Sequence, residues 1–326
     1  MPSSKTPFLL TGVTGGLGAK ILEDLLNKHA VPASSIIATS RSSSNKKRFE
    51  SQGLQFRVAD FKDAASLNDA FSQVENLLFV SSSERDTTTR NAEHQNVINA
   101  AKAAGVDKVW YVSLALGGLG NESKIGFQQA HYETERLLAE SGLDFISIRA
   151  GLYTDAFPLF LNWYPSSKSV PLPRLTPPVT ASKVAFTTRN ELAEGIATLL
   201  AKGLSAFPSI KPQTKYNIVP LTAGSTASLI DIVNAINKGR GTNIPIEYLS
   251  PEDWITASAT DDVGGKSRAW FEARLIFMQG IVEGDAALVD PSLETLLGRK
   301  PETGEHAVER ILRENPEYTW HQNHVR

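Results

Sequence analysis

The stretch LLTGVTGGLGAKI, residues 9–21, constrains the fold more than any other part of the chain. An apolar run ends at Thr11, glycines follow at Gly12, Gly15 and Gly18, and an apolar pattern with helical spacing begins beyond them. A strand, a glycine turn and a helix in this order leave backbone N–H groups free at the helix N-terminus, where a diphosphate is stabilised. The spacing is G-x-x-G-x-x-G, not the commoner G-x-G-x-x-G. The strand before it and the helix after it nevertheless predict a dinucleotide-binding turn.

The alternation of strand and helix patterns continues through the first half of the chain. Five further apolar runs read as strands, at 34–41, 54–61, 75–83, 107–115 and 143–151. Helical patterns lie between them, most clearly at 90–105 and 128–142, and both end in glycine, the preferred residue just past a helix C-terminus. This order predicts an α/β fold, a Rossmann-type doubly wound parallel sheet with helices on both faces.

The regular alternation of strand and helix patterns ends in the second half of the sequence. Residues 164–179 are rich in proline and serine and predict a surface loop. The sequence does not decide whether this loop closes over a substrate. The last residues, 315–326, read as a tail. We expect a Rossmann domain over residues 1–155, completed by a strand near 215–220, and a smaller, mostly helical C-terminal substrate domain over 156–326.

The composition excludes several kinds of chemistry. The chain has 326 residues, a formal net charge of −2, 41% hydrophobic residues and no cysteine. Disulfides, thiolate metal sites and cysteine nucleophiles are therefore excluded, and the scattered histidines predict no metal site. The charge gives no global reason to bind nucleic acid or an anionic membrane. Because no stretch approaches the ~20 apolar residues of a membrane span and the N-terminus lacks a signal-peptide core, we expect a cytoplasmic protein.

The carboxyl ends of the predicted strands supply the candidate cofactor residues. In the first turn these are Gly12, Thr14, Gly15, Gly16, Leu17 and Gly18. The second strand ends at Arg41, where NAD-binding folds usually carry an acidic residue for the ribose 2′-hydroxyl. A guanidinium matches a 2′-phosphate, so Arg41 predicts NADPH/NADP⁺ as the cofactor.

The next strands end in further polar candidates. Asp60 and Phe61 follow the third strand and are expected at the adenine. The fourth strand ends in Ser81, Ser82 and Ser83, and the fifth in Ser113, which is expected nearer the nicotinamide.

Four segments, in this order and spacing, resemble the NmrA-like family, atypical relatives of the short-chain dehydrogenases/reductases. They are VTGGLG, LLFVSSSERDTTTRNAEHQNVINAAKAAGVDKVWYVSL, AHYETERLLAESGLDFISIRAGLYTD and TRNELAEGIATLL. The type 2 NAD(P)H:quinone oxidoreductases have the most similar pattern. The resemblance implies an NADP-binding Rossmann domain and an oxidoreductase that passes hydride to a quinone or another conjugated small molecule, such as an enone, imine or carbonyl.

The resemblance also leaves a second class of function open. Some NmrA-like proteins bind the dinucleotide only as a redox signal and regulate a protein partner. A non-catalytic NADP(H) sensor is therefore the alternative. The sequence does not decide between a monomer and a homodimer.

The helix at 128–142 departs from typical short-chain dehydrogenases, which carry a Tyr-x-x-x-Lys pair there. Here Phe127 and His131 stand at that spacing and share a helix face, but phenylalanine cannot donate a proton. The resemblance implies a histidine at this position, so His131 is the catalytic candidate, as a hydrogen-bond donor or a proton donor. A helix-capping or ribose-contacting role stays open. Tyr153 and Phe157, beyond the sixth strand, are expected to contact the substrate.

Overall fold

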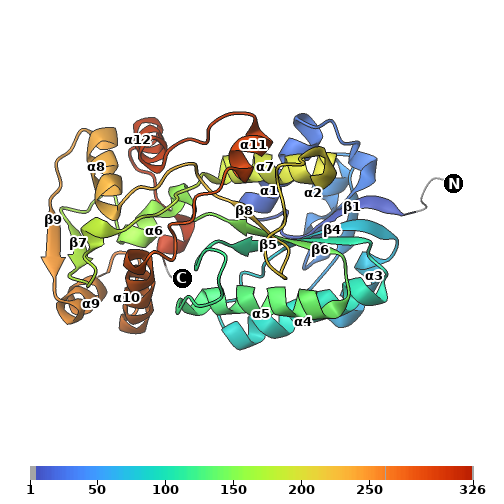
Figure 1. Ribbon diagram of the computed structural model, residues 1–326, viewed down its shortest axis with the longest axis horizontal. Helices are drawn as coiled ribbons and strands as arrows, with labels where there is room; N and C mark the ends of the chain where they lie inside the picture. The colour runs from blue at the N-terminus through green and yellow to red at the C-terminus, as the bar shows by residue number, and fades with distance from the viewer. Residues whose placement is uncertain (1–4, 261, 325–326) are drawn as a thin grey trace.

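A seven-stranded parallel sheet forms the middle layer of one half of the computed structural model, on the right in Figure 1; the structure describes residues 5–260 and 262–324. Its strands are β1 (Thr6–Leu10), β2 (Ile36–Ser40), β3 (Gln55–Val58), β4 (Val74–Val80), β5 (Lys108–Leu114), β6 (Phe145–Ala150) and β8 (Ile218–Leu221). The strand order is β3-β2-β1-β4-β5-β6-β8, and every neighbouring pair is parallel. The predicted Rossmann-type fold is therefore confirmed, and the strand expected near 215–220 joins the sheet beside β6.

Helices cover both faces of this sheet (Figure 1). One face carries α1 (Gly16–Asn27), α2 (Lys46–Glu50), α7 (Arg189–Lys202) and α11 (Ser292–Leu297), and the other carries α3 (Ala64–Phe71), α4 (Thr87–Ala103) and α5 (Gly126–Ser141). Apolar side chains form a separate core on each face, because both faces of a parallel sheet are buried. Gly142 ends α5 with φ +81°, a left-handed conformation that glycine adopts readily, where the sequence predicts the helix end.

A second group of elements packs beside the carboxyl edge of the sheet (Figure 1). It contains α6 (Phe157–Leu161), α8 (Leu229–Arg240), α9 (Pro251–Ala259), α10 (Arg268–Glu283), α12 (Gly304–Glu314) and a small sheet of β7 (Val170–Pro173) and β9 (Ile246–Leu249). This group has its own apolar core. Because α7, β8 and α11 return to the large sheet, a division at residue 155 or 156 would separate them from the core that they share.

Two expectations for this half are wrong. Residues 164–179 are not loop throughout, because β7 pairs in parallel with β9, with Val170 opposite Ile246. The prolines in β7 hide the strand pattern, and prolines are tolerated where a strand lies at a sheet edge. The predicted tail also docks on the body of the protein: Trp320 is 5% exposed, and the Tyr318 hydroxyl donates to the carbonyl of Asp155 at 2.8 Å.

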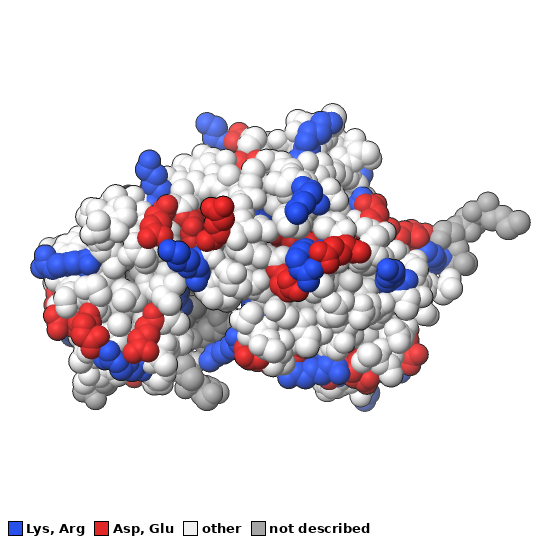
Figure 2. Space-filling view, turned by 60° about the horizontal axis from the view of Figure 1, so that its bottom comes forward, with Lys and Arg blue, Asp and Glu red and all other residues white. Residues whose placement is uncertain are grey.

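The charged side chains of the surface are mixed in sign. On the face in Figure 2, Lys and Arg lie among Asp and Glu and do not gather in a broad patch of one sign. Within the described residues, no helix is both long enough and apolar enough to cross a membrane.

Candidate active site

The glycine turn between β1 and α1 presents backbone N–H groups at the carboxyl edge of the sheet. Gly12 has φ +71°, and the N–H of Gly15 donates to the Gly12 carbonyl at 2.9 Å, which closes the turn. A Cβ on Gly18 would lie 2.3 Å from the Gly12 oxygen, so only glycine permits this approach of helix and turn. No described side chain caps α1, and its first turn holds no acidic residue. The helix N-terminus is therefore open to an anion.

The other residues of the turn divide between surface and core. Thr14 and Gly16 are exposed, whereas the side chain of Leu17 packs into the core. The buried Thr11 hydroxyl donates to a carbonyl at the end of β4 at 3.0 Å and accepts a β4 N–H at 2.9 Å. These bonds fix the turn to the neighbouring strand.

Arg41 follows β2 directly, at the same edge of the sheet. It is exposed and forms no ion pair with another described residue. Nearby cations on α2 are partly engaged: Lys46 Nζ lies 3.8 Å from Glu50 Oε1, and Arg48 lies over the ring of Phe49 at 5.3 Å. The Arg41 guanidinium is therefore available to a ligand phosphate.

The residues after β3 lie next along this edge. The Asp60 carboxylate accepts the N–H of Lys62 at 3.0 Å, and Phe61 packs edge-on against Phe79 with ring centroids 5.7 Å apart. Both side chains are partly exposed. Their contact with an adenine stays a prediction.

The serines after β4 are held by α4. His94 Nε2 accepts the N–H of Ser82 at 2.9 Å and lies 3.4 Å from Ser81 Oγ. The Ser82 hydroxyl donates to Glu93, whereas Ser83 is exposed. Ser82 is thus engaged within the protein, and Ser81 and Ser83 are the better candidates for a cofactor contact.

Ser113 does not face an open surface. It is 3% exposed, and its hydroxyl donates to Glu135 Oε1 at 2.8 Å. Glu135 also accepts from Ser147 at 2.7 Å and pairs with Arg149, Nη2 to Oε2, at 2.5 Å, with both charged side chains fully buried. The Ser113 hydroxyl is therefore engaged within the protein beside this ion pair, and its contact with the nicotinamide stays a prediction.

Arg149 extends the buried pair into the loop after β5. Its Nη1 donates to the carbonyls of Gly118 and Gly120 at 2.6 and 2.8 Å, and Nη2 donates to Asn121 Oδ1 at 2.8 Å. One guanidinium therefore ties α5, β6 and this loop together.

His131 is buried on α5, and its Nδ1 lies 2.9 Å from the hydroxyl of Tyr111 on β5. Burial lowers the pKa of His131 well below its usual value, so the ring is neutral near pH 7. Burial raises the pKa of Tyr111, so the phenol stays protonated and can donate to Nδ1. In that tautomer the His131 Nε2–H is a hydrogen-bond donor. This arrangement favours hydrogen bonding over proton transfer from an imidazolium.

We expect the fold to lose stability as the pH falls below about 6.5, the ordinary pKa of histidine. Burial lowers the pKa of His94 to about 3, and it also lowers the pKa of His131. The unfolded chain therefore binds protons that the folded chain does not. Each histidine should lower the free energy of unfolding by about 1.4 kcal/mol per pH unit below that point.

Urea denaturation at pH 7, 6 and 5 measures this slope. His94→Asn should remove the His94 contribution and so reduce the slope below about pH 6.5. Equal slopes for wild type and His94→Asn would contradict the account.

The two predicted substrate residues differ in their surroundings. Tyr153, just beyond β6, is partly exposed, and burial of its phenol raises the pKa to about 12, so it is neutral. Phe157 is fully buried between Trp163 and Tyr318, with centroid distances of 5.6 and 5.9 Å. Phe157 belongs to the apolar core of the second group of elements, and its contact with a substrate stays a prediction.

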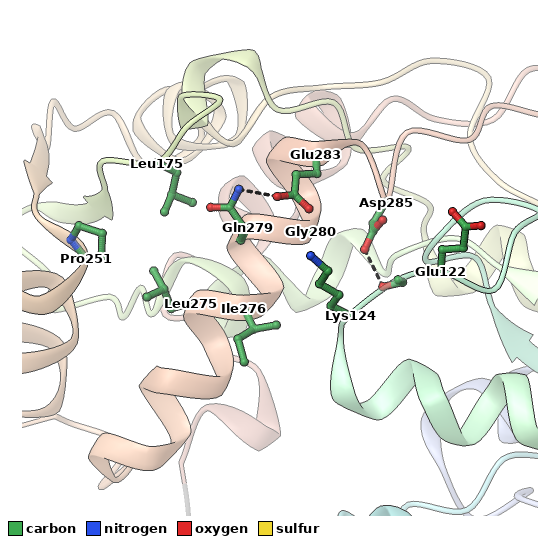
Figure 3. A pocket seen from close by; sticks show the side chains of 11 residues that line it. Glu122, Lys124, Leu175, Pro251, Leu275, Ile276, Gln279, Gly280, Glu283 and Asp285 are labelled. Atoms are coloured by element: carbon green, nitrogen blue, oxygen red, sulfur yellow. Dashed lines mark hydrogen bonds between the residues drawn. The ribbon is translucent and has the colours of Figure 1, made fainter.

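A groove of about 380 Å³ lies between α10 and the loop that leads into α5 (Figure 3). It is lined by Glu122, Ser123, Lys124, Leu175, Pro251, Leu275, Ile276, Gln279, Gly280, Glu283 and Asp285. The Ser123 hydroxyl donates to Asp285 at 2.5 Å, and Lys124 extends from the α5 side toward α10. A second hollow of about 470 Å³ continues it over Gly117, Gly118 and Gly120. The loop that Arg149 holds is therefore a wall of this groove.

The sequence interpretation missed the charged residues that organise the site. Arg149 and Glu135 are fully buried, and Arg189 pairs with Asp155 beside the glycine turn. A signal was present for Arg149, because a lone arginine inside the apolar run FISIRAG needs a buried partner.

Comparison with known proteins identifies the family. Residues 12–200 match the model of a family described as NAD(P)H-binding. An NmrA-like family domain-containing oxidoreductase of Aspergillus flavus, flvB, is 40% identical over 321 residues, which cover 98% of this chain and 99% of that protein. The chain belongs to the NmrA-like, NAD(P)H-binding family. Quinone oxidoreductase 2 of Escherichia coli is 32% identical over 248 residues, 76% of this chain and 79% of that protein.

Two solved structures of NADP(H)-binding reductases have the same fold. The NADPH-dependent quinone oxidoreductase QOR2 of Escherichia coli, complexed with NADPH, has a TM-score of 0.79 and 28% identity, over 94% of this chain and 99% of that one. The Citrobacter sp. triphenylmethane reductase complexed with NADP(H) has a TM-score of 0.77 and 26% identity, over 94% and 100%. The chain is thus an NAD(P)H-dependent oxidoreductase of the NmrA-like, quinone-reductase type.

Proposed function

We propose that this protein is an NADPH-dependent reductase whose acceptor is a quinone or another conjugated small molecule. The open N-terminus of α1 beside the uncommitted guanidinium of Arg41 carries the proposal. The first feature matches a diphosphate and the second a 2′-phosphate. Relatives named as quinone oxidoreductases support the choice of acceptor.

The cofactor residues follow the sheet edge in order. When bound, NADPH supplies the hydride. The glycine turn would hold the diphosphate and Arg41 the 2′-phosphate, while Asp60 and Phe61 would contact the adenine. Ser81, Ser83 and Tyr153 would lie toward the nicotinamide.

His131 would then orient the acceptor. Its neutral imidazole, paired with Tyr111 through Nδ1, offers Nε2–H to an acceptor oxygen. A quinone needs little acid catalysis, because adding hydride gives an aromatic hydroquinone anion that is already stabilised. Placement of the acceptor therefore contributes most of the acceleration. This chemistry matches a helix with Phe127 where typical short-chain dehydrogenases have a tyrosine.

The groove beside α10, whose lining does not include His131, would hold the apolar body of a flat acceptor. Leu175, Leu275 and Ile276 give it an apolar wall, and polar groups lie across from them. Ligand sites commonly combine such a wall with a few polar groups.

The test is NADPH oxidation, followed by absorbance, against benzoquinones, naphthoquinones, enones and cyclic imines. We expect turnover with quinones and a fall in kcat of about tenfold or more for His131→Ala, because one hydrogen bond to the acceptor is lost. His306→Ala, on the exposed face of α12, is the matched control and should leave kcat unchanged.

The outcome separates the enzyme from a sensor. Binding of NADPH without reduction of any acceptor would overturn the proposal and favour a redox sensor that acts on a protein partner. Unchanged kcat in His131→Ala would remove His131 from the mechanism.

A further inference from the structure

Arg189, the first residue of α7, reaches across to the first residue of α1. A Cβ built on Gly16 would lie 2.1 Å from Arg189 Nη1 and 3.3 Å from its Cζ. The guanidinium therefore rests directly on the Gly16 backbone. This is the helix N-terminus that is open to an anion. Only a residue without a side chain at position 16 leaves room for this contact.

Asp155 and Trp320 also contact the Arg189 side chain. Its Nε donates to Asp155 Oδ2, and its Cζ lies 4.4 Å from the ring centroid of Trp320, a cation–π distance. The Tyr318 hydroxyl donates to the Asp155 carbonyl at 2.8 Å and so ties the C-terminal segment to the same place. The Nη groups make no hydrogen bond to another described residue, and the side chain is 19% exposed. The Nε edge of the guanidinium is thus fixed by Asp155, whereas the Nη edge has no partner among the residues that the structure describes.

We propose that Arg189 is a further cofactor-binding residue, which pairs through its Nη edge with the diphosphate at the N-terminus of α1. Asp155 and Trp320 are positioning residues that hold this edge toward Gly16. The inference rests on the proposed function, because it requires a bound pyridine dinucleotide.

The charges support this role. A diphosphate carries two negative charges, whereas a helix N-terminus offers only about half a positive charge. A guanidinium adds a full charge and paired N–H donors, which bind phosphate oxygens more strongly than neutral donors do. The C-terminal segment 318–324, although distant in sequence, then contributes to the cofactor site through Trp320.

Three ligands separate the diphosphate contact from the rest of the site. NADPH and 2′-phospho-ADP-ribose contain the diphosphate, and adenosine 2′-monophosphate does not. By calorimetry, Arg189→Ala should weaken the first two about 10- to 100-fold and leave adenosine 2′-monophosphate unchanged. Arg41→Ala should weaken all three. Arg189→Lys keeps the positive charge but lacks the paired N–H donors of the guanidinium. Its affinity for NADPH should therefore lie between those of wild type and Arg189→Ala.

The positioning residues give an independent readout. Trp320→Ala should weaken NADPH less than Arg189→Ala does, and Trp320→Phe, which keeps an aromatic face, should restore most of the affinity. Arg136→Ala, on the exposed side of α5, is the control for loss of one guanidinium. Thermal unfolding of each variant without ligand shows whether it is folded. If Arg189→Ala is not folded, the affinities of Arg189→Lys provide the test in its place.

Two results would overturn the inference. An unchanged ratio of NADPH affinity to adenosine 2′-monophosphate affinity in the Arg189 variants would show that Arg189 does not touch the diphosphate. Tighter NADPH binding by Arg189→Ala would show that the guanidinium competes with the cofactor. If wild type bound none of the three ligands, the proposed function itself would have failed.

Discussion

Glu135→Gln should destabilise the fold by about 3 to 5 kcal/mol, the usual cost of removing one partner of a buried ion pair. Glu135 and Arg149 are both fully buried, and Glu135 accepts hydrogen bonds from Ser113, Ser147 and Arg149. The amide leaves the guanidinium charge buried without a counter-ion. Urea denaturation measures the loss, and Glu135→Gln/Arg149→Met should lose less than the sum of the single variants, because the pair is coupled.

The same helix supplies the control. Glu133, two residues earlier, pairs with Arg136 at 2.7 Å on the exposed face. Glu133→Gln should cost at most about 1 kcal/mol, because surface ion pairs contribute little. Equal losses for Glu133→Gln and Glu135→Gln would show that the buried pair does not organise the fold.

Arg41→Ala should weaken NADPH binding about 10- to 100-fold while changing NADH binding little. The substitution removes charge-assisted hydrogen bonds to the 2′-phosphate, each stronger than a neutral bond, and NADH has no such phosphate. Calorimetric titration of both cofactors into wild type and variant measures the change in selectivity.

Two control variants test whether the effect is specific to Arg41. Arg136→Ala removes a guanidinium already paired with Glu133 and Glu140 and should leave both affinities unchanged. Lys46→Ala, beside Glu50 on α2, should have a smaller effect than Arg41→Ala. Equal weakening of NADPH and NADH in Arg41→Ala would assign the 2′-phosphate to other residues.

Local sequence patterns were sufficient for the sheet and for the edge where the candidate site lies. Apolar runs separated by helical patterns predict six of the strands, and the turn from Gly12 to Gly18 needs glycines because the backbone itself makes the close approach. The strand at 215–220 could also be predicted, since its apolar run is clear even after a long insertion. Each of these features depends on neighbours close in the sequence.

Features that depend on distant partners could not be predicted. Ser113 follows a strand end as a cofactor residue would, but its environment is set by Glu135 on the next helix and Arg149 on the next strand. Arg189 lies on Gly16 only because α7 packs beside α1. The C-terminal segment reads as polar, yet Trp320 and Tyr318 dock on the body of the protein. Spacing along the chain carries no information about such pairs.

The most direct test is calorimetric titration of the folded wild-type protein with NADPH and with NADH. The open N-terminus of α1 and the guanidinium after β2 predict one NADPH bound per chain, at least about tenfold more tightly than NADH. Failure to bind either nucleotide, or tighter binding of NADH than of NADPH, would contradict the account.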